Sequence, residues 1–254
     1  MSRISEYISI IIPGYNEERR IGKTLDRLLP FCDRHFDRYE IVFADDGSTD
    51  RTVEIVSRYA GSRKVRIVRI PKNAGKGNAV REGMLQASGD YRFFTDADLP
   101  YAPESFLDAI DAFNRFRCDM IAGARNLPTS RDASGLGLSR QIGGRVFSVI
   151  SNFFLHIDVK DTQCGFKGFT AGAAEGIFSR LTVAGYAFDV EIFMLAGKFG
   201  HRICKIPTTL VQSRGSKIKL IRDSAHMLID ILRLYGRYGG RAHSARGKAG
   251  ATRR

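Results

Sequence analysis

The sequence predicts an α/β fold built on a mostly parallel sheet that is flanked by helices. The first 125 residues alternate short β-branched or aromatic runs with segments whose apolar residues recur at helical spacing. Turns rich in Gly, Asn and Asp separate these segments. Such alternation implies right-handed crossovers between strands that lie parallel to one another. At 254 residues the chain can bury a substantial single core.

The expected elements follow one another in a regular order. The run YISIIIP (7–13) is continuously apolar and predicts a strand buried on both faces. Asn16 is the expected N-cap of the next helix. Apolar residues of the first two helices are Ile21, Leu25, Leu28 and Leu29, then Val53, Val56 and Tyr59. Further strands are expected at 39–45, 65–70, 91–95 and 119–124, with helices over 77–87 and after Pro103.

The alternation stops after residue 125, where a different organisation is expected. The expected segments there begin with a polar, Gly-rich loop (126–144) that leads into an apolar helix. DTQCGFKGF (161–169) and a short helix come next, and GYAFDVEIFMLAGKFG (185–200) and a strand, RICKIPTTLVQ (202–212), follow. No linker rich in Pro, Ser or Gly divides them from the first half. They therefore predict a second lobe on the same sheet.

These boundaries predict one domain over residues 1–236. Its two halves are a ligand-binding part, 7–125, and a second part, 126–236. The remainder, 237–254, is rich in Gly, Arg and Ala and is expected to be a basic disordered tail.

Charge and cysteine content narrow the class of protein. The formal net charge of +13 predicts an anionic partner, such as nucleic acid, a lipid surface or a phosphorylated ligand. The cysteines, Cys32, Cys118, Cys164 and Cys204, are scattered and predict free thiols in a reducing cytoplasm, not a disulfide or zinc site. The sequence has no run of about 20 apolar residues, so no membrane-spanning helix is predicted.

Polar segments follow the first four strands: PGYNEE (13–18), DDGSTD (45–50), KNAGKGN (72–78) and DADLP (96–100). Ligands of parallel sheets bind beyond the carboxyl ends of the strands, so these segments predict a binding site. KNAGKGN has neither the spacing of an ATPase phosphate loop nor the fingerprint of a nicotinamide-binding turn.

The carboxylates of Asp96 and Asp98 are the candidate metal ligands. On an extended chain, side chains two residues apart point to the same side, so both could share one Mg²⁺ or Mn²⁺. The alternative is a turn in which one Asp caps the following helix. DDGSTD has a similar alternative, in which it ends a strand and caps a helix.

Five segments together resemble family 2 glycosyltransferases with the GT-A (Rossmann-like) fold. They are SIIIPGYNEE, VFADDGSTDRT, KNAGKGNAVREGM, FFTDADLP and DTQCGFKGF, and their order and spacing match that family over roughly residues 7–235. The chain looks most like the polyprenyl-phosphate branch, the dolichyl-phosphate glucosyl- and mannosyltransferases. The resemblance implies a metal-dependent, inverting hexosyltransferase whose second half is an acceptor-binding lobe.

The resemblance also assigns site residues. Nucleotide-sugar contacts are implied for Pro13, Tyr15, Asn16, Glu17, Asp45, Asp46, Lys76 and Asp96. Asp96 and Asp98 would hold Mg²⁺ or Mn²⁺, although Pro100 stands where related mannosyltransferases carry a Gln ligand. Catalytic roles are implied for Asp98, Arg125 and Arg145, and acceptor-phosphate contacts for Arg125, Arg145, Arg214 and Lys217. Gln163, Asp189 and Glu191 are expected in the acceptor lobe.

The implied substrates are a nucleotide sugar and a polyprenyl or dolichyl phosphate. DTQCGFKGF resembles the glucosyl branch more than the mannosyl branch, so UDP-glucose is the first expected donor and GDP-mannose the alternative. A polysaccharide or protein acceptor, and an inactive relative that only binds nucleotide, remain open. Nucleic acid is not expected as a partner, because no recognition motif accompanies the basic charge. A separate membrane-protein partner stays compatible with the sequence.

The C-terminal region predicts an amphipathic helix. Its apolar stripe is Ile218, Ile221, Ala225, Leu228, Leu232 and Tyr235, and its basic residues lie mainly off that stripe: Lys219, Arg222, His226, Arg233 and Arg237. One interpretation is peripheral docking on the cytoplasmic face of a membrane. The other is a helix that packs on the core.

Overall fold

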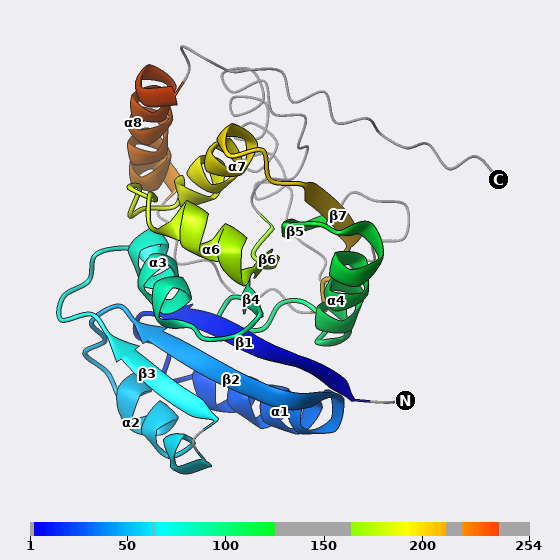
Figure 1. The fold of residues 1–254 in the computed structure, drawn as a ribbon. Helices are drawn as coiled ribbons and strands as arrows, with labels where there is room; N and C mark the ends of the chain where they lie inside the picture. The colour runs from blue at the N-terminus through cyan, green and yellow to red at the C-terminus, as the bar shows by residue number, and fades with distance from the viewer. Residues whose placement is uncertain (1–2, 63, 125–163, 212–219, 239–254) are drawn as a thin grey trace.

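The computed structural model describes residues 3–62, 64–124, 164–211 and 220–238 (Figure 1). Its strands are β1 (Ile4–Gly14), β2 (Phe36–Asp45), β3 (Val65–Arg69), β4 (Tyr91–Phe94), β5 (Met120–Ala124), β6 (Lys167–Thr170) and β7 (Ile203–Pro207). They form one sheet in the order β3-β2-β1-β4-β6-β5-β7, in which β6 is antiparallel to its neighbours. The predicted α/β fold with a mostly parallel sheet is confirmed.

Helices cover both faces of this sheet. They are α1 (Ile21–His35), α2 (Thr52–Ser57), α3 (Lys76–Gln86), α4 (Glu104–Phe116), α6 (Ala171–Phe178), α7 (Phe188–Lys198) and α8 (Leu220–Tyr238), with a 3₁₀ turn at Ala60–Ser62. Figure 1 shows α1 and α2 on one side of β1–β3 and α3 on the other. None of the described helices is long and apolar enough to cross a membrane.

The β-branched run of β1 explains how two cores form. Ile10 and Ile12 pack with α1 and α4, whereas Ile11, between them, packs with α3 on the opposite face. Successive side chains of a strand point to opposite faces, so a strand covered on both sides must be apolar throughout. All three isoleucines are fully buried, as the sequence predicted.

The sheet order places the candidate site. β1 pairs with β2 on one side and with β4 on the other, and all three run parallel. The chain therefore leaves β1 towards one edge of the sheet and later returns to its other side. The carboxyl ends of these three strands meet at this switch point, which is where parallel α/β sheets bind ligands.

Two elements of the second half differ from the sequence prediction. KGFT forms β6, although no strand was expected within DTQCGFKGF. A Cβ at Gly168 would lie 2.4 Å from the Phe93 ring, so the missing side chain allows the strands to approach. The last strand covers 203–207 of the expected 202–212: Pro207 pairs with Ala124, the last described residue of β5, and the Thr208 amide still donates to the Ala124 carbonyl at 3.2 Å.

The prediction that all four cysteines are free thiols is wrong for Cys118 and Cys204. Cys118 and Cys204 form a disulfide with a Cα–Cα distance of 5.9 Å. They are 86 residues apart, and the parallel pairing of β5 with β7 brings them together. The spacing of the two cysteines along the sequence does not indicate this contact. Cys32 and Cys164 remain thiols outside this disulfide, as expected, and both are buried.

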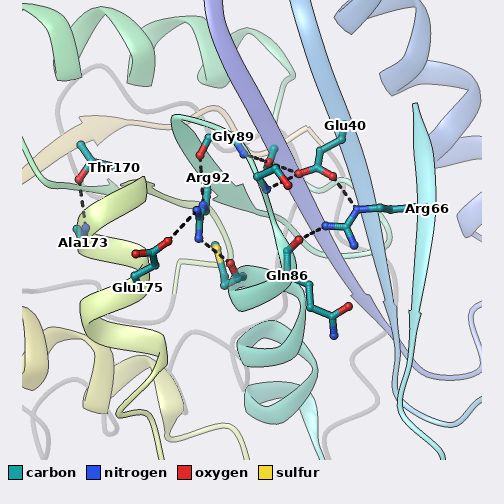
Figure 2. Close-up of polar contacts among 11 residues, drawn as sticks. Glu40, Arg66, Gln86, Gly89, Arg92, Thr170, Ala173 and Glu175 are labelled. Carbon is teal, nitrogen blue, oxygen red and sulfur yellow. Dashed lines mark hydrogen bonds and ion pairs between the residues drawn. The ribbon is translucent and has the colours of Figure 1, made fainter. Parts of the chain in front are cut away.

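Two arginines hold the C-terminal end of α3 (Figure 2). Buried Arg92, on β4, donates to the Met84 carbonyl at 3.1 Å. Arg66, on β3, donates to the Gln86 carbonyl and pairs with Glu40 at 2.7 Å. Cations beside the unpaired carbonyls of a helix end are stabilising. The sheet therefore fixes the end of α3 that lies away from the candidate site.

Candidate active site

The loops after β1 and β2 are joined by hydrogen bonds. Asn16 Oδ1 accepts from the Thr49 amide at 2.8 Å, and the Asn16 amide donates to Ser48 Oγ at 3.0 Å. The Glu17 amide donates to Thr52 Oγ1 at 2.6 Å. Asn16 has φ 54°, a left-handed conformation that Asn tolerates well. The expected capping role of Asn16 is wrong, because α1 begins without a side-chain cap.

The two carboxylates that end β2 have different surroundings. Asp46 accepts the amides of Ala74 and Gly75, both at 2.9 Å, and so ties β2 to the segment before α3. Burial raises the pKa of Asp46 despite these bonds. Asp45 Oδ1 accepts the Ser48 amide at 3.1 Å. Asp45 Oδ2 is buried and has no hydrogen-bond partner among the described residues.

Pro13 and Tyr15 lie where β1 ends. Pro13 pairs with Ala44 in the sheet, and Tyr15 follows the last residue of the strand. The Tyr15 side chain is an exposed aromatic at an edge that otherwise carries polar groups. A planar base can stack on such a ring.

Asp96 and Asp98 lie in a turn after β4. The Leu99 amide donates to the Asp96 carbonyl at 2.9 Å, and Leu99 adopts φ 44°. The expected extended geometry is therefore wrong. The turn interpretation holds, but neither Asp caps α4, whose N-cap residue is Pro103. Burial and the neighbouring Asp96 raise the pKa of Asp98, which shows that the two carboxylates repel each other.

Two cations offset this charge. Lys76 Nζ, at the start of α3, lies 2.6 Å from Asp96 Oδ1. Arg20 Nη1 lies 3.9 Å from Asp98 Oδ2, and its Nε lies 2.7 Å from Glu17. Burial opposes the charged form of Lys76, but Asp96 and then Asp189 raise its pKa above the usual value. Lys76 therefore carries a stable positive charge beside the turn.

The DTQCGFKGF segment reaches the same turn through Gly165. A Cβ at this position would lie 2.4 Å from Asp96 Oδ2. The Gly165 amide donates to Tyr101 Oη at 3.2 Å. Glycine is required here because the backbone comes close to the Asp96 carboxylate.

Asp189 and Lys167 form a buried ion pair next to Lys76. Lys167 Nζ lies 2.7 Å from Asp189 Oδ1 and also donates to the Cys164 carbonyl at 2.8 Å. Burial raises the pKa of Asp189, while Lys167 and then Lys76 lower it. Glu191, two residues further along α7, is fully buried and accepts hydrogen bonds from the segment that starts at Thr182.

The remaining predicted site residues lie outside the described part of the chain: Arg125, Arg145, Gln163, Arg214 and Lys217. Within the described part, no group of three or more metal-binding side chains occurs. Sequence reasoning missed Arg20, Gly165 and Lys167. A lysine between aromatic residues in GFKGF was a detectable signal for Lys167, since a buried lysine needs a carboxylate partner.

The sequence matches the family model described as Glycosyl transferase family 2 over residues 9–178. The chain belongs to glycosyltransferase family 2. Its curated relatives include dolichyl-phosphate beta-glucosyltransferases of Dictyostelium discoideum (32% identical over 91% of this chain and 75% of the relative) and Saccharomyces cerevisiae (32%, 89% and 73%). The Homo sapiens relative of the same name is 30% identical over 92% of this chain and 76% of its own length.

Solved structures share the fold of this family 2 chain. Glucosyl-3-phosphoglycerate synthase from Mycobacterium tuberculosis with UDP superposes with a TM-score of 0.66 at 20% identity, covering 92% of this chain and 80% of that one. Another structure of that enzyme holds Mn²⁺, UDP and glucosyl-3-phosphoglycerate (TM-score 0.66, 18% identity, 92% and 80% covered). S. aureus TarS 1-349 gives a TM-score of 0.64 at 20% identity, covering 93% and 66%. The predicted GT-A fold is confirmed.

The raised pKa of Asp98 leads to a stability prediction. A carboxyl whose folded pKa lies above its unfolded value destabilises the fold when ionised, and this cost disappears as the pH falls through the folded pKa. In EDTA at pH 7, Asp98→Asn should therefore increase the free energy of unfolding. Each kcal/mol gained corresponds to about 2–4 °C in Tm. The gain should shrink near pH 4, as urea unfolding at both pH values would measure.

Asp111→Asn is the matched control, because Asp111 is an exposed carboxylate on α4. Its effect should stay within about 0.5 kcal/mol. A less stable Asp98→Asn protein at pH 7 would show that Arg20 more than offsets the burial of Asp98 and its repulsion by Asp96.

Proposed function

We propose that this family 2 enzyme transfers glucose from UDP-glucose to a polyprenyl or dolichyl phosphate with inversion at the sugar. The observation that carries the proposal is similarity across about nine-tenths of the chain to relatives named dolichyl-phosphate beta-glucosyltransferase. The site supports it, because aromatic, acidic and basic groups meet at the switch point of the sheet.

The end of the sheet suits a nucleotide sugar. Tyr15 offers a ring for base stacking, and the unpaired oxygen of Asp45 can accept an N–H from the base. Lys76 lies at the first position of α3 and points its ammonium at the Asp96 turn. In this proposal Lys76 holds the diphosphate of the donor, because an ammonium is a point charge that suits phosphate oxygens.

Asp96 and Asp98 fit a divalent cation. Mg²⁺ is commonly held by one or two carboxylates together with substrate phosphates, so the lack of a third described ligand is no obstacle. Burial and then the charge of Asp96 raise the pKa of Asp98, and a bound hard cation would favour the ionised form of both carboxylates. Bound Mg²⁺ or Mn²⁺ would offset the charge that develops on the departing nucleoside diphosphate. The Mn²⁺ and Mg²⁺ in solved structures of this fold support the choice.

The acceptor chemistry does not require a general base. A phosphate monoester has a second pKa of about 6, so its oxygens are largely ionised at neutral pH. Asp189, a carboxylate in the expected acceptor lobe, is held by Lys167 at 2.7 Å and is not set up to remove a proton. Cations must instead position the acceptor, and Arg125, Arg145, Arg214 and Lys217 remain the candidates.

The sequence left open whether the C-terminal helix docks on a membrane or packs on the core, and α8 has one face suited to each. Ile231 and Leu234 are buried against the loop before α7 and α7 itself. Leu232 and Tyr235 of the predicted stripe, together with Ile229, are exposed at 50%, 45% and 44%. The helix thus packs on the core with one face and presents a second apolar face outward.

The exposed face suits contact with a lipid surface. Arg233 and Arg237 are exposed on the same helix and can meet anionic head groups. In this proposal the enzyme lies peripherally on the cytoplasmic membrane face, where its lipid acceptor is found.

A transfer assay tests the function. Purified protein with a short polyprenyl phosphate and Mg²⁺ or Mn²⁺ should transfer labelled glucose from UDP-glucose, and EDTA should stop the reaction because Asp96 and Asp98 lose their cation. GDP-mannose should be a poorer donor. Transfer from GDP-mannose alone would make the mannosyl alternative correct, and labelling of a sugar hydroxyl but not the lipid phosphate would refute the acceptor.

Two variants test the acceptor chemistry in the same assay. Arg145→Ala should lower kcat/KM for the acceptor about ten- to hundredfold, since a charge-assisted hydrogen bond contributes roughly 1.5–3 kcal/mol. Asp189→Asn keeps an oxygen for Lys167 and should cost much less, with an unchanged pH profile. An inactive but folded Asp189→Asn protein beside a near-normal Arg145→Ala protein would indicate a hydroxyl acceptor.

A double substitution on α8 tests the membrane contact. Leu232→Ser with Tyr235→Ser removes two exposed apolar side chains and should weaken binding to anionic vesicles about tenfold or more. Co-sedimentation with vesicles measures this change. Phe116→Ser is the control, because Phe116 is equally exposed at the end of α4. Equal loss of binding in both proteins would argue against docking through α8.

A further inference from the structure

The first turn of α3 is capped from another part of the chain. Its N-cap residue, Gly75, has no side chain to accept the free amides of the turn. The Ala184 carbonyl accepts them instead, from Gly77 at 2.7 Å and from Asn78 at 3.3 Å. Lys76 lies within this turn, so the segment Thr182–Gly185 (the capping segment) fixes the backbone from which Lys76 reaches Asp96.

Two glycines make the close approach possible. A Cβ at Gly75 would lie 2.5 Å from the Ala184 carbonyl oxygen, and one at Gly77 would lie 2.5 Å from the Val183 carbonyl oxygen. Gly75 also has φ 108°, which side chains rarely adopt. The N-terminus of α3 and the capping segment are therefore fitted to each other at backbone distance.

Glu191 in turn holds the capping segment. Its Oε2 accepts the amides of Thr182 and Val183 at 2.9 and 2.7 Å. Its Oε1 accepts the Thr182 hydroxyl at 2.8 Å and the Tyr238 hydroxyl at 3.2 Å. Both oxygens of a fully buried carboxylate are thus occupied by donors. An amide in its place would turn an NH₂ group towards donors.

Packing alone does not fix the capping segment. A cavity of about 350 Å³ lies between this segment and α8, lined on the helix by Asp230, Arg233, Leu234 and Arg237. Val183 of the capping segment packs against the apolar clusters that contain Leu234 and Ile231 of α8. Polar contacts reach the end of the helix as well: Arg237 donates to Thr182 Oγ1 at 2.6 Å, and Tyr238 donates to Glu191. The capping segment is therefore held by these hydrogen bonds together with the packing of Val183.

We propose that Glu191 is a positioning residue for the donor site. It acts through the capping segment on the first turn of α3 and thereby sets where Lys76 places its ammonium. Tyr238 and Arg237 connect α8 to the same chain of contacts, so the position of α8 also affects the capping segment. Glu191 touches no substrate group in this scheme, and the inference rests on the proposed role of Lys76 in holding the donor diphosphate.

Glu191→Gln in the full chain tests the inference. UDP affinity with Mg²⁺, measured by calorimetry, should fall about five- to tenfold, the range expected when a hydrogen-bonded contact is lost. KM for UDP-glucose should rise in parallel, while kcat and KM for the lipid acceptor stay within about twofold. Amide hydrogen exchange should accelerate at Gly77 and Asn78, because their acceptor carbonyl is displaced, and should be unchanged at Ile41.

Glu175→Gln is the matched control. Glu175 is an exposed carboxylate on α6 that pairs with Arg92. Arg92 binds the C-terminal end of α3, whereas Lys76 lies at its N-terminal end. It should leave UDP affinity and exchange at Gly77 unchanged. If Glu191→Gln does not fold, Tyr238→Phe decides, because it removes one donor from the same carboxylate. It should weaken UDP binding about two- to threefold and accelerate exchange at Gly77.

Two results would overturn the proposal. Wild-type UDP affinity and wild-type exchange at Gly77 and Asn78 in a folded Glu191→Gln protein, or in Tyr238→Phe where that variant decides, would show that Glu191 does not position the turn. A uniform loss in kcat, donor KM and acceptor KM would show a general structural role. A Lys76→Met variant tests the proposed role of Lys76 separately from the proposed role of Glu191. Unchanged UDP affinity in that variant removes the proposed role of Lys76, whereas the exchange result still tests the link from Glu191 to α3.

Discussion

The ion pair between Lys76 and Asp96 is the interaction on which the site geometry depends. Four carboxylates, Asp45, Asp46, Asp96 and Asp98, are gathered where β2 and β4 end. Such an arrangement repels itself unless cations or hydrogen-bond donors compensate it. Among the described residues, Lys76 supplies a positive charge 2.6 Å from Asp96, and it comes from α3, not from the strands. The position of α3 therefore determines how much of this acidic edge is neutralised.

Helix α3 is held by polar contacts at both ends. Arg92 and Arg66 bind its last carbonyls on one side of the molecule (Figure 2), and the Ala184 carbonyl binds its first amides on the other. Its middle packs on β1, where a Cβ at Gly83 would lie 2.6 Å from Ile11. A short helix fixed in this way can place one lysine with little freedom. The proposed contact of Lys76 with the donor diphosphate requires such a placement.

The second half of the chain completes both the sheet and the site. Strand β6 lies antiparallel between β4 and β5. Gly165, just before this strand, approaches Asp96. The same stretch supplies Lys167 to Asp189 at the start of α7. Helix α8 packs on this half and exposes a separate apolar face. The proposed donor site, the buried ion pair and the candidate membrane face are thus built from neighbouring elements of this half of the chain and the sheet.

The sequence by itself determined the layers of the fold and the edge that carries the site. The period of the apolar residues fixes which faces must be buried, and right-handed crossovers then bring PGYNEE, DDGSTD and DADLP to one end of the sheet. Tertiary structure alone decided the rest. The Cys118–Cys204 bond, the antiparallel β6 and the pairing of Lys167 with Asp189 join residues that are distant in sequence. Local periodicity cannot encode such contacts, because they depend on strand register and on which backbone segments can approach at glycine.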